Sequence, residues 1–184
     1  MSELEQEVLE SFQAGETEGK ALTARPYLGL TREEMTWAAV AHASILVTVL
    51  LGVVTGGLGA VLGLAIPAVI WYVYREKSEY VADQARQATI FQAAGMIGLL
   101  VLALAGVVLL VVGWAVTAVL LIVLVGLILI PVMLIVTIVW PMALVLLPIV
   151  QLVYGCYAAA EAYQGRPFRY RWVADLIDRY QAQI

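Results

Sequence analysis

The sequence predicts an all-α, polytopic transmembrane protein with about four spans in two hairpins, plus a re-entrant segment or a fifth helix. Hydrophobic residues make up 63% of the 184 residues and charged residues 13%. Soluble domains have roughly 45–50% apolar and about 25% charged residues. No Asp, Glu, Lys or Arg occurs in residues 35–74 or in residues 87–160. Because a helix needs about 20 apolar residues to cross a bilayer, these two runs predict several membrane spans.

Residues 1–30 are expected to form an acidic arm on the cytoplasmic side. Residues 1–34 carry eight glutamates against three basic residues, a net charge of −5. The first residues are acidic rather than basic, and apolar residues become continuous only at Trp37, so the pattern is not that of a signal peptide. Apolar residues at helical spacing between Leu4 and Phe12 leave two alternatives open, a short amphipathic helix and a solvated arm.

The transmembrane domain is expected over residues 31–165, and its first hairpin over residues 36–75. Thr31 and Glu34 form a capping-box pattern, which predicts a helix beginning at Arg32. As one helix, the first apolar run would be about 60 Å long, twice the ~30 Å hydrocarbon thickness. We therefore expect a break at residues 55–59, where three glycines occur, with spans over residues 36–54 and 59–75.

Four glycines of this hairpin are candidates for close helix packing. They form two pairs with a spacing of four. Small residues at this spacing let two helix backbones approach closely, which is why these glycines are candidates. We expect them to pack the hairpin against itself; the alternative is a groove for a dimer or a partner subunit. The residues are Gly52, Gly56, Gly59 and Gly63.

A cytoplasmic loop is expected over residues 76–90 and a second hairpin over residues 91–165. Loop charge favours an even number of spans, because all ten Lys and Arg then lie on the cytoplasmic side. Trp114 and Trp140 fit the outer interface, with residues 115–139 between them as a re-entrant segment bent at Gly126 and Pro131. Five spans remain the alternative.

The tail, residues 166–184, is expected to be an interfacial helix on the cytoplasmic surface. Docking onto lipid and docking onto the protein's own loops remain alternatives. Its apolar residues fall on one helical face, and they are Trp172, Val173, Leu176, Ile177 and Tyr180.

Few side chains in the apolar runs are suited to chemistry, so we expect no enzymatic activity, no cofactor and no metal site. No acidic residue lies deep in either run, and Cys156 is the only cysteine. His42, the only histidine, lies in the first span, where an imidazole could bind a haem or a pigment. The alternative is a hydrogen bond to a backbone carbonyl or to a neighbouring span. The ten basic residues are scattered and outnumbered, which argues against nucleic-acid binding.

Four blocks of the sequence resemble a family of bacterial membrane proteins of unknown function. This family includes the magnetosome protein MamF and is distantly similar to the Tic import component of the chloroplast inner envelope. The similar blocks are residues 37–44, residues 67–71 with 77–81, residues 84–92 and residues 159–170. The motif residues carried over are Lys77, Ser78, Tyr80, Arg86, Phe91, Gln92, Glu161, Gly165 and Tyr170.

The chain departs from the family pattern at three positions of one block. Gln84, Gln87 and Ile90 stand where the family has His, Glu and Asn, so neither a polar contact nor a metal role of those positions is expected to carry over. The resemblance implies a multi-pass protein of the inner membrane with both termini in the cytoplasm, and it implies no particular reaction.

Two functional classes follow. The first is a non-catalytic accessory, structural or assembly subunit that packs in the bilayer against a membrane-protein partner or against other copies of itself. The alternative is a translocation or permeation component similar to the Tic import channel. The scattered polar residues of the spans, Thr55, Thr117, Thr137 and Gln151, argue against a permanently wet pore.

Overall fold

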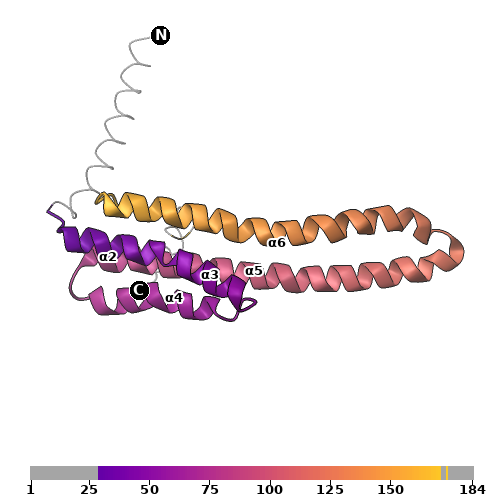
Figure 1. Ribbon diagram of the computed structural model, residues 1–184, viewed down its shortest axis with the longest axis horizontal. Helices are drawn as coiled ribbons and strands as arrows, with labels where there is room; N and C mark the ends of the chain where they lie inside the picture. Colours follow the sequence, from indigo (N-terminus) through magenta and orange to yellow (C-terminus); the bar gives the residue numbers. More distant parts are fainter. Residues whose placement is uncertain (1–28, 171–172, 174–184) are drawn as a thin grey trace, which may run out of the picture.

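The computed structural model describes residues 29–170 and residue 173, and this part of the chain is helical without any strand (Figure 1). The all-α architecture expected from the sequence is therefore confirmed. In chain order the elements are α2 (Arg32–Ala43), α3 (Ile45–Val54), α4 (Ala60–Tyr74), α5 (Glu79–Leu120), the short 3₁₀ helix η2 (Leu121–Val123) and α6 (Gly126–Tyr163).

Helices α2 and α3 follow one another with only Ser44 between them and form an apolar rod, Arg32–Val54. The capping box at its start is confirmed. The hydroxyl of Thr31 accepts the backbone N–H of Glu34, and the Glu34 carboxylate accepts the backbone N–H of Thr31. The expected break is also confirmed, because α4 begins at Ala60 after a turn that contains two glycines with positive φ, Gly56 and Gly57.

Helices α5 and α6 form a long hairpin of 42 and 38 residues. The chain reverses at η2 and at Leu124, which has a φ of 61°. Residues 115–139 are therefore the far end of two long helices and not a separate re-entrant or fifth helix. The expected bend at Pro131 is wrong, because Pro131 lies within α6, whereas Gly126 directly follows the reversal as the first residue of α6.

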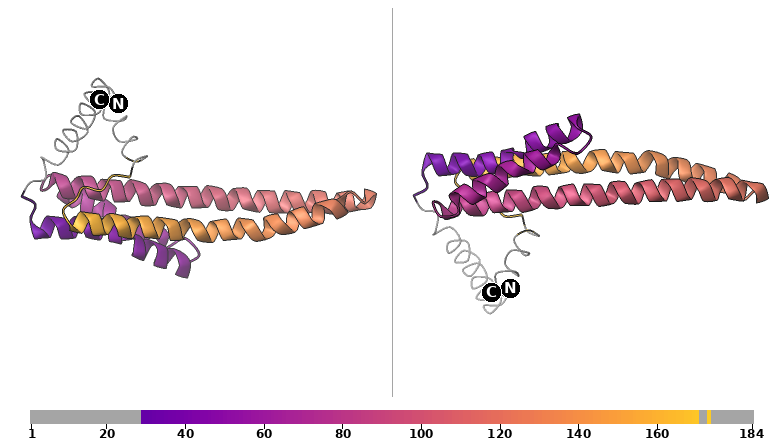
Figure 2. Two further views of the ribbon diagram at one scale, coloured as in Figure 1. Left: turned by 90° about the horizontal axis from the view of Figure 1, so that it is seen from above. Right: turned by 90° about the horizontal axis from the view of Figure 1, so that it is seen from below.

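The first three helices pack beside one end of the α5–α6 hairpin (Figures 1 and 2). We call this end the base: it is where α2 begins, where α4 is connected to α5 and where α6 ends. The opposite end, at η2, is the tip. The charged residues of the described helices all fall in their segments at the base. Buried alanines, among them Ala38 and Ala162, form a core with Ile70, Tyr80 and Val81 between α2, α4, α5 and α6.

Three described helical segments are long and apolar enough to cross a membrane. They are Arg32–Val54, Glu79–Val123 and Gly126–Tyr163, and α4 is a shorter apolar helix. This set agrees with a polytopic membrane protein. The acidic arm lies outside the described residues except for its last two, and the tail is described only at residues 166–170 and 173.

Candidate functional site

The candidate site is a buried polar cluster at the base, which we call the base cluster: His42, Gln84, Gln87, Phe91 and Tyr170. Helix α2 contributes the histidine, and α5 contributes the two glutamines and Phe91. Tyr170 comes from residues 164–170, the segment that follows α6. This segment leaves the helix at Gly165, whose φ of +73° favours glycine, and Pro167 cannot continue the helix.

Both imidazole nitrogens of His42 have hydrogen-bond partners. Nε2 lies 3.1 Å from Oε1 of Gln84, and Nδ1 lies 3.2 Å from the hydroxyl of Tyr170. Because an amide oxygen only accepts, Nε2 carries the proton and Nδ1 accepts from the tyrosine. The central metal of a haem or a pigment would have to displace one of these partners, so the arrangement corresponds to the alternative of a histidine bonded to neighbouring segments.

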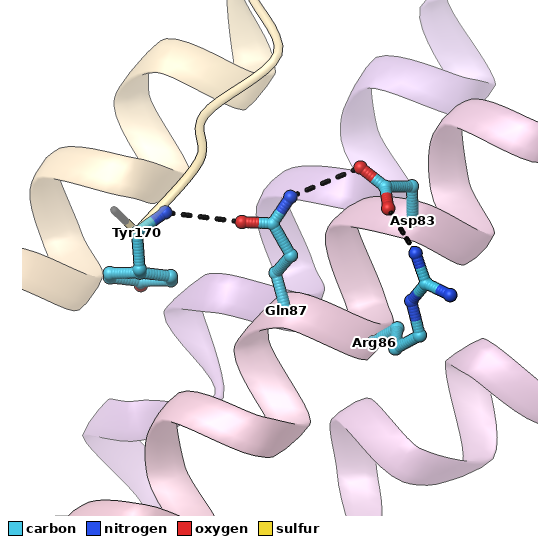
Figure 3. Close-up of polar contacts among 4 residues, drawn as sticks. All are labelled: Asp83, Arg86, Gln87 and Tyr170. Atoms are coloured by element: carbon cyan, nitrogen blue, oxygen red, sulfur yellow. Dashed lines mark hydrogen bonds and ion pairs between the residues drawn. The ribbon is translucent and has the colours of Figure 1, made fainter. Parts of the chain in front are cut away.

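Gln84 and Gln87 hold the extended segment after α6 by its backbone. Oε1 of Gln84 accepts the N–H of Phe168 at 3.2 Å, and Oε1 of Gln87 accepts the N–H of Tyr170 at 3.1 Å. Figure 3 shows that the amide of Gln87 also donates to Asp83, whose carboxylate accepts from Arg86. The N–H groups of Phe168 and Tyr170 are thus paired with side-chain amides, as alternate N–H groups of a strand are paired with a neighbouring strand.

Aromatic contacts fix the same segment from the side. The ring of Tyr170 is stacked on Phe91, with 4.0 Å between centroids, and Phe168 meets Tyr170 edge to face at 4.9 Å. Burial raises the pKa of the Tyr170 hydroxyl, so this group stays protonated at neutral pH and can donate to His42. The segment is therefore held by its backbone, by stacking and by one hydroxyl.

A second buried polar group lies further from the base, between the rod and α5. The hydroxyl of Thr48 donates to Oε1 of Gln92 at 2.8 Å, and Nε2 of Gln92 donates to Ser44 at 2.9 Å. All three side chains are buried. In a low-dielectric interior such satisfied contacts link helices, because the alternative is an unpaired polar group in hydrocarbon.

The remaining motif residues hold helix ends together. The hydroxyl of Ser78 accepts the N–H of Val81 at the start of α5 and donates to Glu34 of α2. The Tyr80 hydroxyl donates to the carbonyl of Ala162 at 2.9 Å. At the base, Lys77 lies 5.8 Å from the Tyr74 ring, the half-buried Arg86 pairs with Asp83, and Arg166 pairs with Glu161.

The four glycines of the first hairpin have different surroundings. A Cβ added to Gly63 would lie 2.4 Å from Cα of Thr48, so α3 and α4 approach closely there. At Gly59 it would meet the Leu51 carbonyl at 2.9 Å, and at Gly52 only a methyl group at 3.4 Å. Gly56 has nothing within 4 Å and a φ of +65°, so its expected packing role is wrong: it makes the turn instead.

The base cluster has the chemistry of a structural junction. In residues 29–170 and 173, no three His, Cys, Asp or Glu side chains gather in a way that could hold a metal ion. Two buried atoms, Nε2 of Gln84 and Nε of Arg86, make no hydrogen bond within the described chain. The expectation that polar contacts at Gln84 and Gln87 do not carry over is wrong, because both amides bond neighbouring segments. Sequence reasoning did not single out Thr48 or Phe168 as contact residues.

Comparison with known proteins gives one match. The model of the Magnetosome magnetite crystal formation protein family (MamF_MmsF) matches residues 33–177, which is more than half of the chain. No curated protein and no solved structure matches the chain. These comparisons give no support to the similarity with the Tic import component.

Proposed function

Because the chain belongs to the Magnetosome magnetite crystal formation protein family, we propose that it is a non-catalytic accessory or assembly subunit of a membrane complex that serves crystal formation. The observation that supports this proposal is that the buried polar side chains bond to other parts of the same chain. In the base cluster and in the Thr48–Gln92–Ser44 group, they bond one helix or segment to another. Such an interior builds a rigid scaffold.

The surfaces left for partners are of two kinds. The long hairpin presents aliphatic side chains along its outside, while the base presents charged side chains in the α4–α5 loop. The arm adds six glutamates in residues 1–30. We propose that partner proteins bind at the base, where charge can give specificity, because apolar contact with another helix gains little over contact with lipid.

Native electrophoresis after extraction in mild detergent tests the accessory role. We expect the full chain to migrate in an assembly larger than its own 19.9 kDa with bound detergent. A variant lacking residues 1–28 should lose part of the assembly, because it lacks the six glutamates of the arm. Migration of the full chain as a lone subunit would contradict the proposal.

Ion conductance in liposomes distinguishes the accessory role from a permeation role. A solute path needs side chains that replace water, yet the hydroxyls of Thr117 and Thr137 donate to carbonyls of their own helices. The purified protein should show no ion conductance. Conductance that disappears in Thr117→Val or Gln151→Leu would favour a channel instead.

We also propose that the base faces the cytoplasm of an inner-membrane protein, with both termini on that side. The support is the clustering of Lys and Arg beside the spans. Cysteines placed at Ser2, Glu76 and Gln183, with Cys156 replaced, should all resist a membrane-impermeant thiol reagent on intact cells. Labelling of Gln183→Cys alone would show that the two termini lie on opposite sides.

A further inference from the structure

The two hairpins start together at the base but differ greatly in length (Figure 1). The rod Arg32–Val54 has 23 residues and α4 has 15. At about 1.5 Å per residue they are about 35 Å and about 22 Å long. Helix α5 has 42 residues, and its charge-free part from Gln87 onward is about 50 Å long. A hydrocarbon core of ~30 Å cannot match both hairpins if both stand upright.

Neither hairpin turn carries a side chain suited to water. Residues 121–126 are all aliphatic or glycine, and Ile122 is 84% exposed. In the first turn Leu58 is 83% exposed, and the hydroxyl of Thr55 is used in a bond to the carbonyl of Leu51. A turn that meets water on the far side of a membrane has no reason to present such side chains.

Several backbone groups of each turn are paired within the turn itself. Leu124 donates to Leu121 and Leu127 donates to Leu124, while Gly57 donates to Gly52 and Ala60 donates to Gly57. In hydrocarbon each unpaired N–H or C=O is costly, so a turn can lie there only when such bonds are made internally.

The polar groups of the outer half of the long hairpin also face inward. The indole N–H of Trp114 donates to Thr137 at 3.0 Å, and that of Trp140 donates to the carbonyl of Leu102 at 3.2 Å. Both indole N–H groups therefore bond within the hairpin. In membrane proteins tryptophan more often lies at the membrane–water interface.

We propose that both hairpin turns lie in lipid acyl chains, and that the α5–α6 hairpin lies obliquely within the hydrocarbon core without presenting its tip to water. A tilt of roughly 50°, steeper than the roughly 0–40° of most membrane helices, brings about 50 Å of helix within the ~30 Å core. All described charged segments then stay on one side of the membrane. The protein would therefore insert from one face and return to it, which goes beyond the accessory role proposed above and does not depend on it.

Collision measurements on spin-labelled protein in phosphatidylcholine liposomes test this arrangement. Single cysteines are placed at Ile122 and Leu58 in a Cys156→Ala background, and Glu76→Cys is the matched control at the base, where the side chain is 82% exposed. Oxygen concentrates in hydrocarbon and a nickel chelate stays in water. We expect several-fold more collisions with oxygen than with nickel at Ile122 and Leu58, and the reverse at Glu76.

Two results would overturn the proposal. A label at either turn that collides more with nickel than with oxygen would place that turn in water. A label that neither reagent reaches would show that protein covers the turn. Migration as a lone subunit would count against the accessory role and leave the lipid-embedded turns untouched.

Discussion

The ring of Tyr170 lies parallel to the ring of Phe91, with 4.0 Å between the centroids and 6° between the planes. The two residues are far apart in sequence, and their contact closes the base over His42. Because the tyrosine is also bonded through its backbone N–H to Gln87 and lies against His42, this one residue joins α2, α5 and the segment after α6.

Removing the Phe91 ring and removing the Tyr170 hydroxyl should both lower stability, by different amounts. Phe91→Ala removes a buried ring and should cost about 3–5 kcal/mol of unfolding free energy. Tyr170→Phe keeps the stack but leaves Nδ1 of His42 without its donor, which should cost about 1–3 kcal/mol. Denaturant unfolding in detergent measures both. Tyr163→Phe, at an exposed tyrosine, is the control, and equal stability of Tyr170→Phe and this control would refute the role of the hydroxyl.

Alkaline pH should weaken the same contact. Burial raises the pKa of Tyr170, which lies outside the membrane-spanning helices, above its ordinary value of about 10. The unfolded chain loses this proton first as pH rises, so the stabilisation is complete below about pH 10 and declines above it. The stability difference between the wild type and Tyr170→Phe should therefore shrink from pH 8 to pH 11. A constant difference would contradict the pKa shift.

The sequence predicted the first hairpin well because local signals fix it. The capping box at Thr31 and the glycines of residues 55–59 act through bonds and φ angles within a few residues. At the tip the only local signal is Gly126, where a Cβ would meet the backbone of Leu121 and Thr117, while the left-handed residue of the reversal is Leu124, whose side chain gives no such signal. Which residues meet Gln84 and Gln87 also depends on a segment more than 80 positions away, and no local pattern encodes that pairing.

Close packing of α3 on α4 should depend on Gly63. In Gly63→Ala the new Cβ would meet the backbone of Thr48, which cannot rotate away as a side-chain end can. The variant should lose about 1–3 kcal/mol of unfolding free energy, the usual cost of overpacking. Gly98→Ala is the matched control, because it also lies in a helix and its Cβ has open space. It should be neutral or gain up to about 1 kcal/mol from helix propensity. Equal stability of the two variants would refute the contact.

The outer half of the long hairpin should be held in register by the bond from Trp114 to Thr137. Trp114→Phe removes the donor and Thr137→Val removes the acceptor, so the double variant should lose less stability than the sum of the single variants. The expected coupling is about 0.6 kcal/mol, and at most about 1.7 kcal/mol, as for other hydrogen bonds between membrane helices. Thr89→Val is the matched control for Thr137→Val, since each removes a hydroxyl that donates to the carbonyl four residues earlier, but Thr89 has no bond to Trp114. Its losses should add to those of Trp114→Phe. Additive losses for Trp114 and Thr137 as well would mean that the two helices are aligned by shape alone, with the indole N–H contributing nothing measurable.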